Sequence, residues 1–357
     1  MENQQSIHPL ISIGIPLYNG EETISATLES ILKQNLKNIE IVLCDDSSSD
    51  RTFEIVSKFS NKYQFIKSYK NDSNIGMDRN FLKTAKLCSG RYVWFFGQDD
   101  YLRSGAINKV KDTLKYNDIG IVYINYRYFD KNQKRLLVSN YLETIIKNEN
   151  SILKDKSEIF YEDSSLFFKD FLDLPNFLPA TVMKRRFWND IDFSDFIGTA
   201  YVQVAAQYLN LDKCKIVVIT KPYVNGTIPD DNWQVNGRSL FMIMAGYLKM
   251  QKLVNKKNPG SIPKFTFLHN RNKFLLNYIF HIYLCRTLNL KVERHHIDLL
   301  KEIFGNRILF KLYLRPILLV PYGLLKVLYY LLLPLKKISK FLISNLIKGN
   351  FFFSRIK

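Results

Sequence analysis

The sequence predicts an α/β protein in which a mainly parallel sheet carries helices on both faces and is followed by a helical C-terminal region. Short runs rich in Ile and Val alternate with segments of helical period through the first 125 residues. Beyond residue 256 the pattern is helical, without a strand signal or an internal repeat. We therefore expect a domain at 1–255 with halves at 1–125 and 126–255, a helical extension at 256–306 and a tail at 307–357.

Strands and helices alternate in the first half. Five apolar runs have the length and boundaries of buried strands: Leu10–Leu17, Ile39–Cys44, Phe65–Tyr69, Tyr92–Phe96 and Ile119–Ile124. Four segments between them have helical spacing: Glu21–Gln34, Asp50–Phe59, Met77–Cys88 and Ser104–Tyr116. Asp50 and Ser104 stand where helix N-caps are expected. Ligands of such sheets bind beyond the carboxyl ends of the strands, here in the loops after residues 15, 44, 70 and 96.

The second half is less regular. Residues 130–160 are polar and weakly periodic, so we expect them to run over the surface. Order is expected again at 163–172, 178–183, a helix at 199–210, a strand at 215–219, a Pro/Gly/Asn-rich loop at 221–237, a helix at 238–255 and a linker at 256–260.

Charge is distributed unevenly along the chain. The formal net charge is +18, yet residues 1–250 hold 31 basic and 30 acidic residues, whereas residues 251–357 hold 20 and 3. Basic residues in the tail stand among Leu, Ile, Val and Tyr, which favours an anionic membrane surface over nucleic acid. Lys326 and three prolines interrupt the apolar stretch and disfavour a spanning helix. A membrane span, and a helix pair that either forms a homodimer or packs in a core, stay open as alternatives.

Cysteine usage and the N-terminus indicate a reducing compartment. Cys44, Cys88, Cys214 and Cys285 lie far apart without metal-binding spacing, so we expect buried reduced thiols. The first residues lack the basic and apolar regions of a secretory signal. We expect the protein at the cytoplasmic face of the inner (plasma) membrane, as a peripheral or monotopic protein.

Polar residues follow the first two predicted strands. Pro16, Tyr18 and Asn19 leave main-chain groups and a flat ring free to meet a planar ligand. Asp45 and Asp46 are adjacent carboxylates, which repel each other unless donors or positive charge lie nearby. A nucleobase or a ribose supplies such donors, while helix capping and turn formation are the structural alternative.

The next two strands also end in polar loops. Gly76 permits a turn before a helix, and Arg79, one turn into that helix, reaches a phosphate or pairs with Asp78 or Asp46. Asp99 and Asp100 end an apolar strand, and paired carboxylates suit Mg²⁺ or Mn²⁺ bound together with diphosphate oxygens. A turn that caps the next helix is the alternative. Neither a Walker loop nor a dinucleotide-binding glycine motif occurs in the chain.

These four motifs, at Ile13–Asn19, Glu40–Asp50, Asn74–Asn80 and Gly97–Leu102, resemble those of family 2 glycosyltransferases. Within that family they are most similar to bacterial surface-polysaccharide enzymes of the abequosyltransferase type. The resemblance covers about residues 8–125 and implies the GT-A fold with a Rossmann-like sheet. It also implies metal-assisted, inverting transfer of a sugar from a nucleotide donor to a saccharide acceptor, which the basic tail suggests is lipid-linked.

The resemblance assigns roles by position. The donor-side residues are Pro16, Tyr18, Asn19, Asp45, Asp46, Asn74, Gly76, Arg79, Gln98 and Asp99. Asp99 and Asp100 would hold the metal, although Gly97 replaces the first carboxylate of the commoner Asp-x-Asp-Asp pattern.

The acceptor side matches the family less closely. The usual Glu-Asp pair is missing, because Glu162-Asp163 comes too early and is typical of a helix start. Asp195 is the expected general base, with Asp192 as the second candidate, and both are open to interpretation as surface carboxylates. Trp233 would form a sugar platform and Arg238 a diphosphate clamp, or Trp233 would only cover the core.

Two other functions are alternatives to sugar transfer. A nucleotidyltransferase would need a Gly-rich basic loop after the first strand, where this chain has Pro-Leu-Tyr-Asn-Gly. A non-catalytic membrane scaffold that binds nucleotide sugars would share the motifs, and only an assay of transfer separates it from an enzyme.

Overall fold

The computed structural model describes residues 8–116, 118–130, 133–147, 156–227 and 238–266, together with positions 319, 321, 323 and 324. The chain divides into two compact units. The first comprises Met1–Pro229 and Met250–Pro263, and the second comprises Asp230–Lys249 and Lys264–Lys357. The sheet and the helices that cover it belong to the first unit. The predicted tail at 307–357 lies outside the described residues except at those four positions.

Four parallel strands form the first half of the sheet. β1 (Ile11–Leu17), β2 (Ile39–Asp45), β3 (Ile66–Lys70) and β4 (Tyr92–Phe95) lie in the order β3-β2-β1-β4. Each predicted strand agrees with its observed counterpart to within one residue at either end. Successive residues of β1 point to opposite faces of the sheet, and nearly all of them are buried, as expected for parallel strands covered by helices on both faces.

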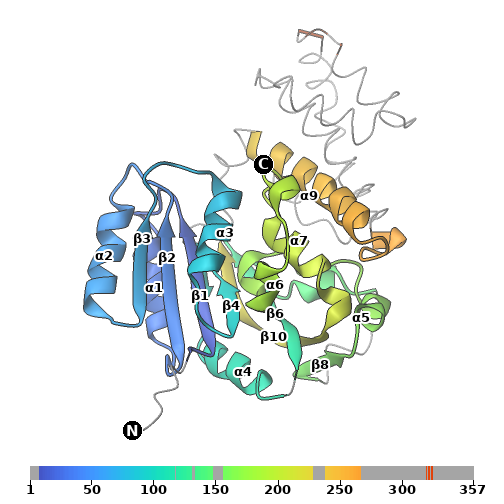
Figure 1. Ribbon diagram of the computed structural model, residues 1–357, viewed down its shortest axis with the longest axis horizontal. Coiled ribbons are helices and arrows are strands. Elements are labelled where there is room, and N and C mark those ends of the chain that lie inside the picture. The colour runs from blue at the N-terminus through green and yellow to red at the C-terminus, as the bar shows by residue number, and fades with distance from the viewer. Residues whose placement is uncertain are drawn as a thin grey trace. The chain divides into compact units, whose positions relative to one another are not determined.

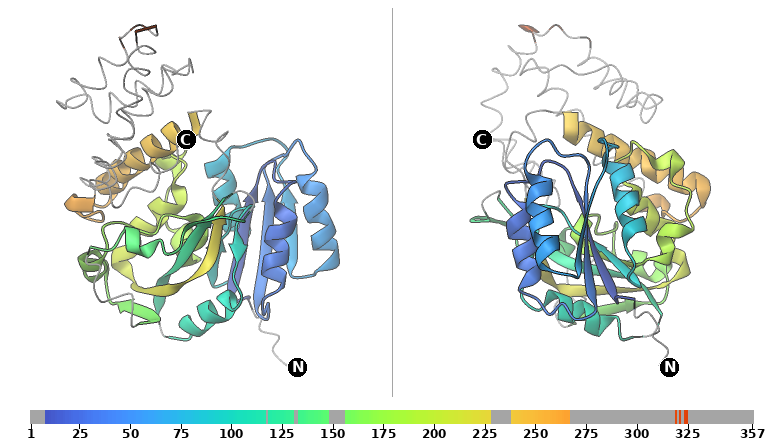
Figure 2. Two further views of the ribbon diagram at one scale, coloured as in Figure 1. Left: turned by 180° about the vertical axis from the view of Figure 1, so that it is seen from behind. Right: turned by 60° about the vertical axis from the view of Figure 1, so that its left-hand side comes forward.

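Helices cover both faces of these strands. α1 (Ile24–Leu32) and α2 (Thr52–Lys62) lie on one face and α3 (Met77–Leu87) lies on the other (Figures 1 and 2). The predicted N-cap at Ser104 is wrong, because α4 (Ala106–Thr113) is capped by Gly105, whose φ of +80° suits glycine. Asp50 lies one residue before the N-cap Arg51 of α2, so that prediction is also wrong by one position. Its carboxylate nevertheless accepts a hydrogen bond from the Thr52 N–H at 2.9 Å.

The second half of the sheet is mixed. β6 (Ile119–Phe129) and β10 (Lys215–Thr227) pair in parallel, and β9 (Thr181–Lys184) lies between β4 and β6, antiparallel to both. Three short strands extend this half: β5 (Tyr101–Leu102) and β8 (Glu158–Tyr161) pair with β10, and β7 (Leu136–Val138) pairs with β6. The fold is therefore α/β with a large, mostly parallel sheet, as predicted.

Two expectations for this half are wrong. β7 and β8 lie in the segment 130–160 that was expected to run over the surface, and residues 221–227 continue β10 instead of forming a loop. The register of β10 against β6 shifts between Ile219 and Val224, across Pro222. Proline lacks the N–H of a regular ladder, so an irregularity at this place lets the strand continue past it.

Short helices connect these strands: α5 (Ser164–Asp170), α6 (Arg186–Asn189) and α7 (Val202–Tyr208), with 3₁₀ turns η1 (Leu142–Thr144), η2 (Leu178–Ala180), η3 (Ser194–Phe196) and η4 (Leu211–Lys213). Asp163 caps α5 through its carboxylate, which confirms that Glu162-Asp163 marks a helix start. α9 (Arg238–Lys257) passes from the second unit into the first at Met250. Among the described residues, no helix has the length and apolarity needed to cross a bilayer.

Cysteine burial agrees with the prediction. Cys44, Cys88 and Cys214 are buried free thiols, and burial raises the pKa of Cys88 to about 12. The remaining cysteine, Cys285, lies outside the described residues.

Glu40 joins the amino ends of the central strands. Its Oε1 accepts hydrogen bonds from Ser12 Oγ at 2.5 Å, Ser89 N at 2.6 Å and Gly90 N at 3.2 Å. Lys67 Nζ lies 3.0 Å from Oε2. Burial alone raises the pKa of Glu40, but the hydrogen bonds from Ser12, Ser89 and Lys67 outweigh burial and lower the pKa to about 2. This network fastens the edge of the sheet opposite the predicted site.

Candidate active site

The predicted loops meet at the carboxyl edge of the parallel strands. The Asp46 N–H donates to the Leu17 carbonyl at 2.8 Å, which joins the ends of β1 and β2. The Asn71 N–H donates to the Asp45 carbonyl at 2.8 Å, which joins the end of β2 to the segment after β3. The prediction that these loops share one edge is therefore confirmed.

Asp46 shapes the loop that leads into α3. Its buried carboxylate accepts hydrogen bonds from Asn71 Nδ2 at 2.8 Å, Ile75 N at 2.9 Å and Gly76 N at 3.0 Å. Gly76 has a φ of +87°, which favours glycine. Asn74 Oδ1 accepts a hydrogen bond from the same Gly76 N–H at 3.0 Å. These contacts fix the loop wall, and Asp46 forms no ion pair with Arg79.

Asp45 and Asn19 close the neighbouring loops. The Asp45 carboxylate accepts hydrogen bonds from Ser48 N at 3.1 Å and from Ser48 Oγ. Asn19 Oδ1 accepts a hydrogen bond from Ser49 N at 3.0 Å. The Asn19 N–H donates to Ser48 Oγ at 2.9 Å, so the loops after β1 and β2 are tied together. The adjacent carboxylates of Asp45 and Asp46 thus accept hydrogen bonds from donors within the protein. This agrees with the alternative that these residues form turns.

Gln98 clamps the main chain of Tyr18. Its Oε1 accepts a hydrogen bond from Tyr18 N at 3.0 Å, and its Nε2 donates to Tyr18 O at 3.1 Å. A Cβ atom on Gly20 would lie 2.6 Å from Gln98 Oε1, so this approach needs glycine at position 20. The Tyr18 side chain itself is half exposed. The clamp therefore presents an accessible aromatic ring at the site, with Pro16 two residues before it in β1.

Asp99 and Asp100 converge on Gly97. A Cβ atom on Gly97 would lie 2.2 Å from Asp100 Oδ2 and 3.1 Å from Asp99 Oδ1. The departure from the Asp-x-Asp-Asp pattern therefore has a physical reason: the space of a side chain at position 97 is occupied by the carboxylate of Asp100.

The end of β10 holds this acidic pair in place. Thr227 N donates to Asp100 Oδ1 at 3.2 Å, and Thr227 Oγ1 donates to the Asp99 carbonyl. Burial raises the pKa of Asp99. Burial and the neighbouring charge of Asp99 raise the pKa of Asp100 well above its usual range. Within the described ranges no Lys, Arg or His forms an ion pair with either carboxylate.

This donor set fits a divalent cation. Two converging carboxylates of raised pKa gain most from a hard cation, and oxygen is the ligand that Mg²⁺ and Mn²⁺ prefer. The described residues contain no cluster of three or more His, Cys, Asp or Glu side chains that could hold a metal ion, so the pair would need further ligands from substrate or water.

Asp78 fastens the acceptor-side segment to α3. Its Oδ2 accepts hydrogen bonds from Gly198 N at 2.7 Å and Ala200 N at 3.0 Å, and burial raises its pKa. Asp78 lies in the first turn of α3, directly after the loop that Asp46 holds. Gly198 and Ala200 follow η3, which contains the predicted base Asp195. The structure thus brings the segment of the predicted bases next to the start of α3.

The two predicted bases have different surroundings. Asp192 accepts hydrogen bonds from Ser194 N at 2.9 Å and Ser194 Oγ at 3.0 Å, and these bonds lower its pKa. Asp195 Oδ2 lies 3.3 Å from Lys257 Nζ, and its side chain is more than half exposed. Trp233 lies outside the described residues, and Arg238 begins α9 without a described side chain.

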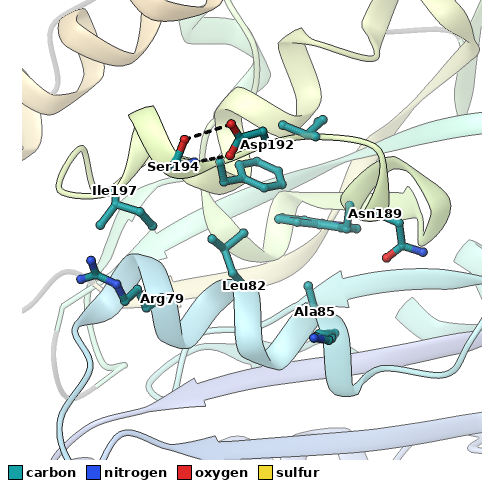
Figure 3. Close-up of a pocket in the computed structure, with 11 residues that line it drawn as sticks. Arg79, Leu82, Ala85, Asn189, Asp192, Ser194 and Ile197 are labelled. Atoms are coloured by element: carbon teal, nitrogen blue, oxygen red, sulfur yellow. Dashed lines mark hydrogen bonds between the residues drawn. The ribbon is translucent and has the colours of Figure 1, made fainter.

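Arg79 lines a pocket of about 530 Å³ on the outer face of α3 (Figure 3). Asp192, Ser194 and Ile197 line the same pocket from the segment across it. Arg79 is exposed and forms no ion pair with a described residue, neither with Asp78 nor with Asp46.

Neither Asp78 nor Thr227 was predicted to have a functional role, although both organise the site. Asp78 looks like an ordinary acidic residue in the first turn of a helix, where it suits the helix dipole. Thr227 lies in a segment predicted to be a loop, 127 residues after Asp100. Only the pairing of β10 with β5 brings it to the acidic pair.

Comparisons with known proteins identify the family of this chain. The family described as Glycosyl transferase family 2 matches residues 12–174. The abequosyltransferase RfbV of Salmonella typhimurium is 30% identical over 257 residues, which is 70% of this chain and 76% of that protein. The glucosyltransferase WfaP of Escherichia coli, whose name gives the acceptor as α-D-GlcNAc-diphosphoundecaprenol, is 39% identical over 34% of this chain and 47% of its own.

Solved structures share the fold. TarS 1–349 of S. aureus in complex with UDP-GlcNAc has a TM-score of 0.51 and 19% identity, over 82% of this chain and 80% of that one. The mannosyltransferase PcManGT of Pyrobaculum calidifontis, in complex with GDP-Man and Mn²⁺, has a TM-score of 0.51 and 13% identity, over 91% and 87% of the two chains. The predicted resemblance is confirmed: the chain is a glycosyl-transferring enzyme and belongs to glycosyl transferase family 2.

Proposed function

We propose that this enzyme transfers a sugar from a nucleoside diphosphate donor to a lipid-linked saccharide during synthesis of a bacterial surface polysaccharide. The observation that carries the proposal is the convergence of Asp99 and Asp100 on Gly97, beside the loops that end the parallel strands. The names of relatives support the acceptor class, because WfaP acts on a saccharide joined to a lipid diphosphate.

On the donor side, the nucleobase of the sugar nucleotide would stack on the exposed ring of Tyr18 near Pro16. Asp45, Asp46, Asn19, Asn74 and Gly76 would form the wall of the nucleoside site through the loop contacts described above. Gln98 would act through Tyr18, whose main chain it holds.

Asp99 and Asp100 would hold Mg²⁺ or Mn²⁺. When bound, the cation would offset negative charge on the departing diphosphate. The buried acidic pair has no positive partner among the described residues, so without the cation it would repel the negatively charged diphosphate. We therefore expect nucleotide binding to depend on cation binding.

The transfer itself would be a single displacement. The acceptor hydroxyl oxygen forms a bond to the anomeric carbon, the bond from that carbon to the diphosphate breaks, and the hydroxyl proton passes to an aspartate. We propose inversion at the anomeric carbon for this step. Asp195 is the preferred base and Asp192 the second candidate, since the hydrogen bonds from Ser194 that lower the pKa of Asp192 weaken it as a base.

We further propose that residues 307–357 attach the enzyme to the cytoplasmic face of the membrane, where a lipid-linked acceptor is found. Trp233 and Arg238 would complete the sugar and diphosphate contacts. Deletion of 307–357 is expected to abolish sedimentation with anionic liposomes, and unchanged sedimentation would refute this part.

The proposal is tested by a panel of UDP-, dTDP-, CDP- and GDP-sugars with Mn²⁺. A nucleotide sugar that binds raises the melting temperature of the native protein, so a thermal-shift screen first identifies the nucleobase that the enzyme accepts. Transfer to a synthetic lipid-diphosphate saccharide is then compared between wild type and the variants Asp99→Asn and Asp100→Asn. Loss of transfer in both variants supports the site. Full activity in both refutes it, and binding without transfer or hydrolysis would favour a scaffold.

A further inference from the structure

The pocket beside α3 has a composition that the donor site does not explain. Its apolar wall comes from α3, α6 and the segment after α6: Leu82, Ala85, Trp188, Ile191, Phe193 and Ile197. The aromatic part of this wall is packed firmly, because the Trp188 ring contacts Phe95 at a centroid distance of 5.1 Å and stacks on Phe193 at 6.0 Å. A pocket of about 530 Å³ with such a wall accommodates an apolar chain.

Two exposed cations stand along the same pocket. Arg79 and Lys86 both line it, and neither forms an ion pair with a residue that the structure describes. Asp192 is the carboxylate in its wall, and both oxygens of Asp192 already accept hydrogen bonds from Ser194. The pocket therefore offers positive charge together with apolar surface, which is the chemistry of an anionic amphiphile.

The pocket begins at the donor edge of the sheet. Arg79, Leu82 and Lys86 are spaced by three and four residues, so they share one face of α3. Figure 3 shows Arg79, Leu82 and Ala85 turned toward the segment that carries Asn189 and Ile197. Arg79 lies three residues after Gly76, which Asp46 holds at the carboxyl edge, whereas Lys86 lies about 10 Å further along the axis.

We propose that this pocket binds the lipid diphosphate of the acceptor. Arg79 would hold the diphosphate and the apolar wall would hold the first isoprenoid units, which leaves the saccharide free to reach the donor edge. This inference rests on the proposed function and assigns Arg79 to the acceptor and not to the donor. Lys86 would add a weaker, more distant attraction.

Farnesyl diphosphate is a suitable probe, because it joins the two chemistries in a soluble molecule. Calorimetric titration of the full chain is expected to give saturable binding, with inorganic diphosphate and farnesol both binding at least tenfold more weakly. Arg79→Ala is expected to weaken binding about tenfold, in line with loss of a charge-assisted hydrogen bond. Arg79→Lys is expected to recover part of that loss. Leu82→Ser should weaken farnesyl diphosphate binding without changing the binding of inorganic diphosphate.

Lys83→Ala is the matched control, since Lys83 is an exposed cation of the same helix outside the pocket. It should change affinity less than twofold. Equal losses in Lys83→Ala and Arg79→Ala, or the absence of saturable binding, would overturn the inference. Displacement of farnesyl diphosphate by UDP with Mn²⁺ would also overturn it, by locating the probe in the donor site.

The same variants separate this inference from the proposed function. Thermal shifts with nucleotides and Mn²⁺ should be unchanged in Arg79→Ala. If no nucleotide binds to the wild type, the proposed function fails, while Arg79-dependent binding of farnesyl diphosphate would still support the pocket.

Discussion

Replacement of Glu40 by Gln tests whether the amino edge of the sheet depends on a charged carboxylate. Gln keeps the size of the side chain and an oxygen that accepts from Ser12, Ser89 and Gly90, but it removes the charge that these donors and Lys67 surround. The pKa of Glu40 is lowered from 4.5 to about 2 in the folded protein. Since one pKa unit corresponds to about 1.4 kcal/mol, ionisation of Glu40 stabilises the fold by about 3 kcal/mol.

The pH dependence follows from the direction of this shift. A depressed carboxyl pKa stabilises the folded state above the unfolded pKa of 4.5, and this stabilisation is lost as pH falls toward 2. We therefore expect Glu40→Gln to lower the free energy of unfolding by about 3 kcal/mol at pH 7. The difference from wild type should shrink progressively below pH 4.5.

Urea unfolding followed by circular dichroism measures both quantities between pH 7 and pH 3. Glu54→Gln is the matched control, because Glu54 pairs with Lys58 on the exposed side of α2. That substitution should leave the unfolding midpoint unchanged. A difference that stays constant from pH 7 to pH 3, or one below about 1 kcal/mol at pH 7, would refute the reasoning.

Substitutions at three further positions test the site. Gly97→Ala places a methyl group where the Asp100 carboxylate lies, so it should abolish the Mn²⁺-dependent rise in melting temperature and cost about 1–3 kcal/mol of stability by urea unfolding. Asp78→Asn keeps an acceptor for Gly198 and Ala200 and should retain activity, whereas Asp78→Ala leaves two N–H groups unpaired, should cost about 2–4 kcal/mol and should abolish transfer. Gln98→Ala releases Tyr18 and should raise the KM for the donor severalfold while changing kcat less.

Each of these expectations has an opposing result. An unchanged Mn²⁺ response in Gly97→Ala would show that the acidic pair does not bind the cation. Equal activity losses in Asp78→Asn and Asp78→Ala would assign Asp78 a role that needs its charge. A fall in kcat at constant KM in Gln98→Ala would contradict the view that Gln98 acts by holding the ring of Tyr18.

The parallel half of the fold could be predicted because its signals are local. Strands buried on both faces give continuous apolar runs, and β1 to β4 were located to within one residue. The second half depends on long-range pairing that a local pattern does not reveal. β8 has mixed burial and is stabilised by pairing with β10, and β10 continues past Pro222 because a register shift absorbs the proline. Local composition therefore indicated a surface segment and a loop.

The site shows the same division. The loop positions followed from strand order, so the sequence located Tyr18, Asp46 and Asp99 at one edge. The individual side-chain contacts could not be predicted, because they join residues far apart in the sequence. Asp46 accepts hydrogen bonds from main-chain N–H groups 29 and 30 residues away, and Asp100 accepts one from an N–H group 127 residues away. The roles of Asp195, Asp192 and Arg79 stay predictions, although the structure describes the surroundings of each residue.

The order of strands in the sheet has a consequence for how the enzyme folds during synthesis. β9, at residues 181–184, pairs with both β4 and β6 and separates them. β1 pairs with β2, and β2 with β3, over one crossover each, whereas β6 is joined to these strands only through β9 and cannot extend their sheet until β9 has been synthesised. Thr227, which ties down the acidic pair, emerges later still. A chain interrupted before residue 215 would carry every donor-side motif and still lack an assembled cation site.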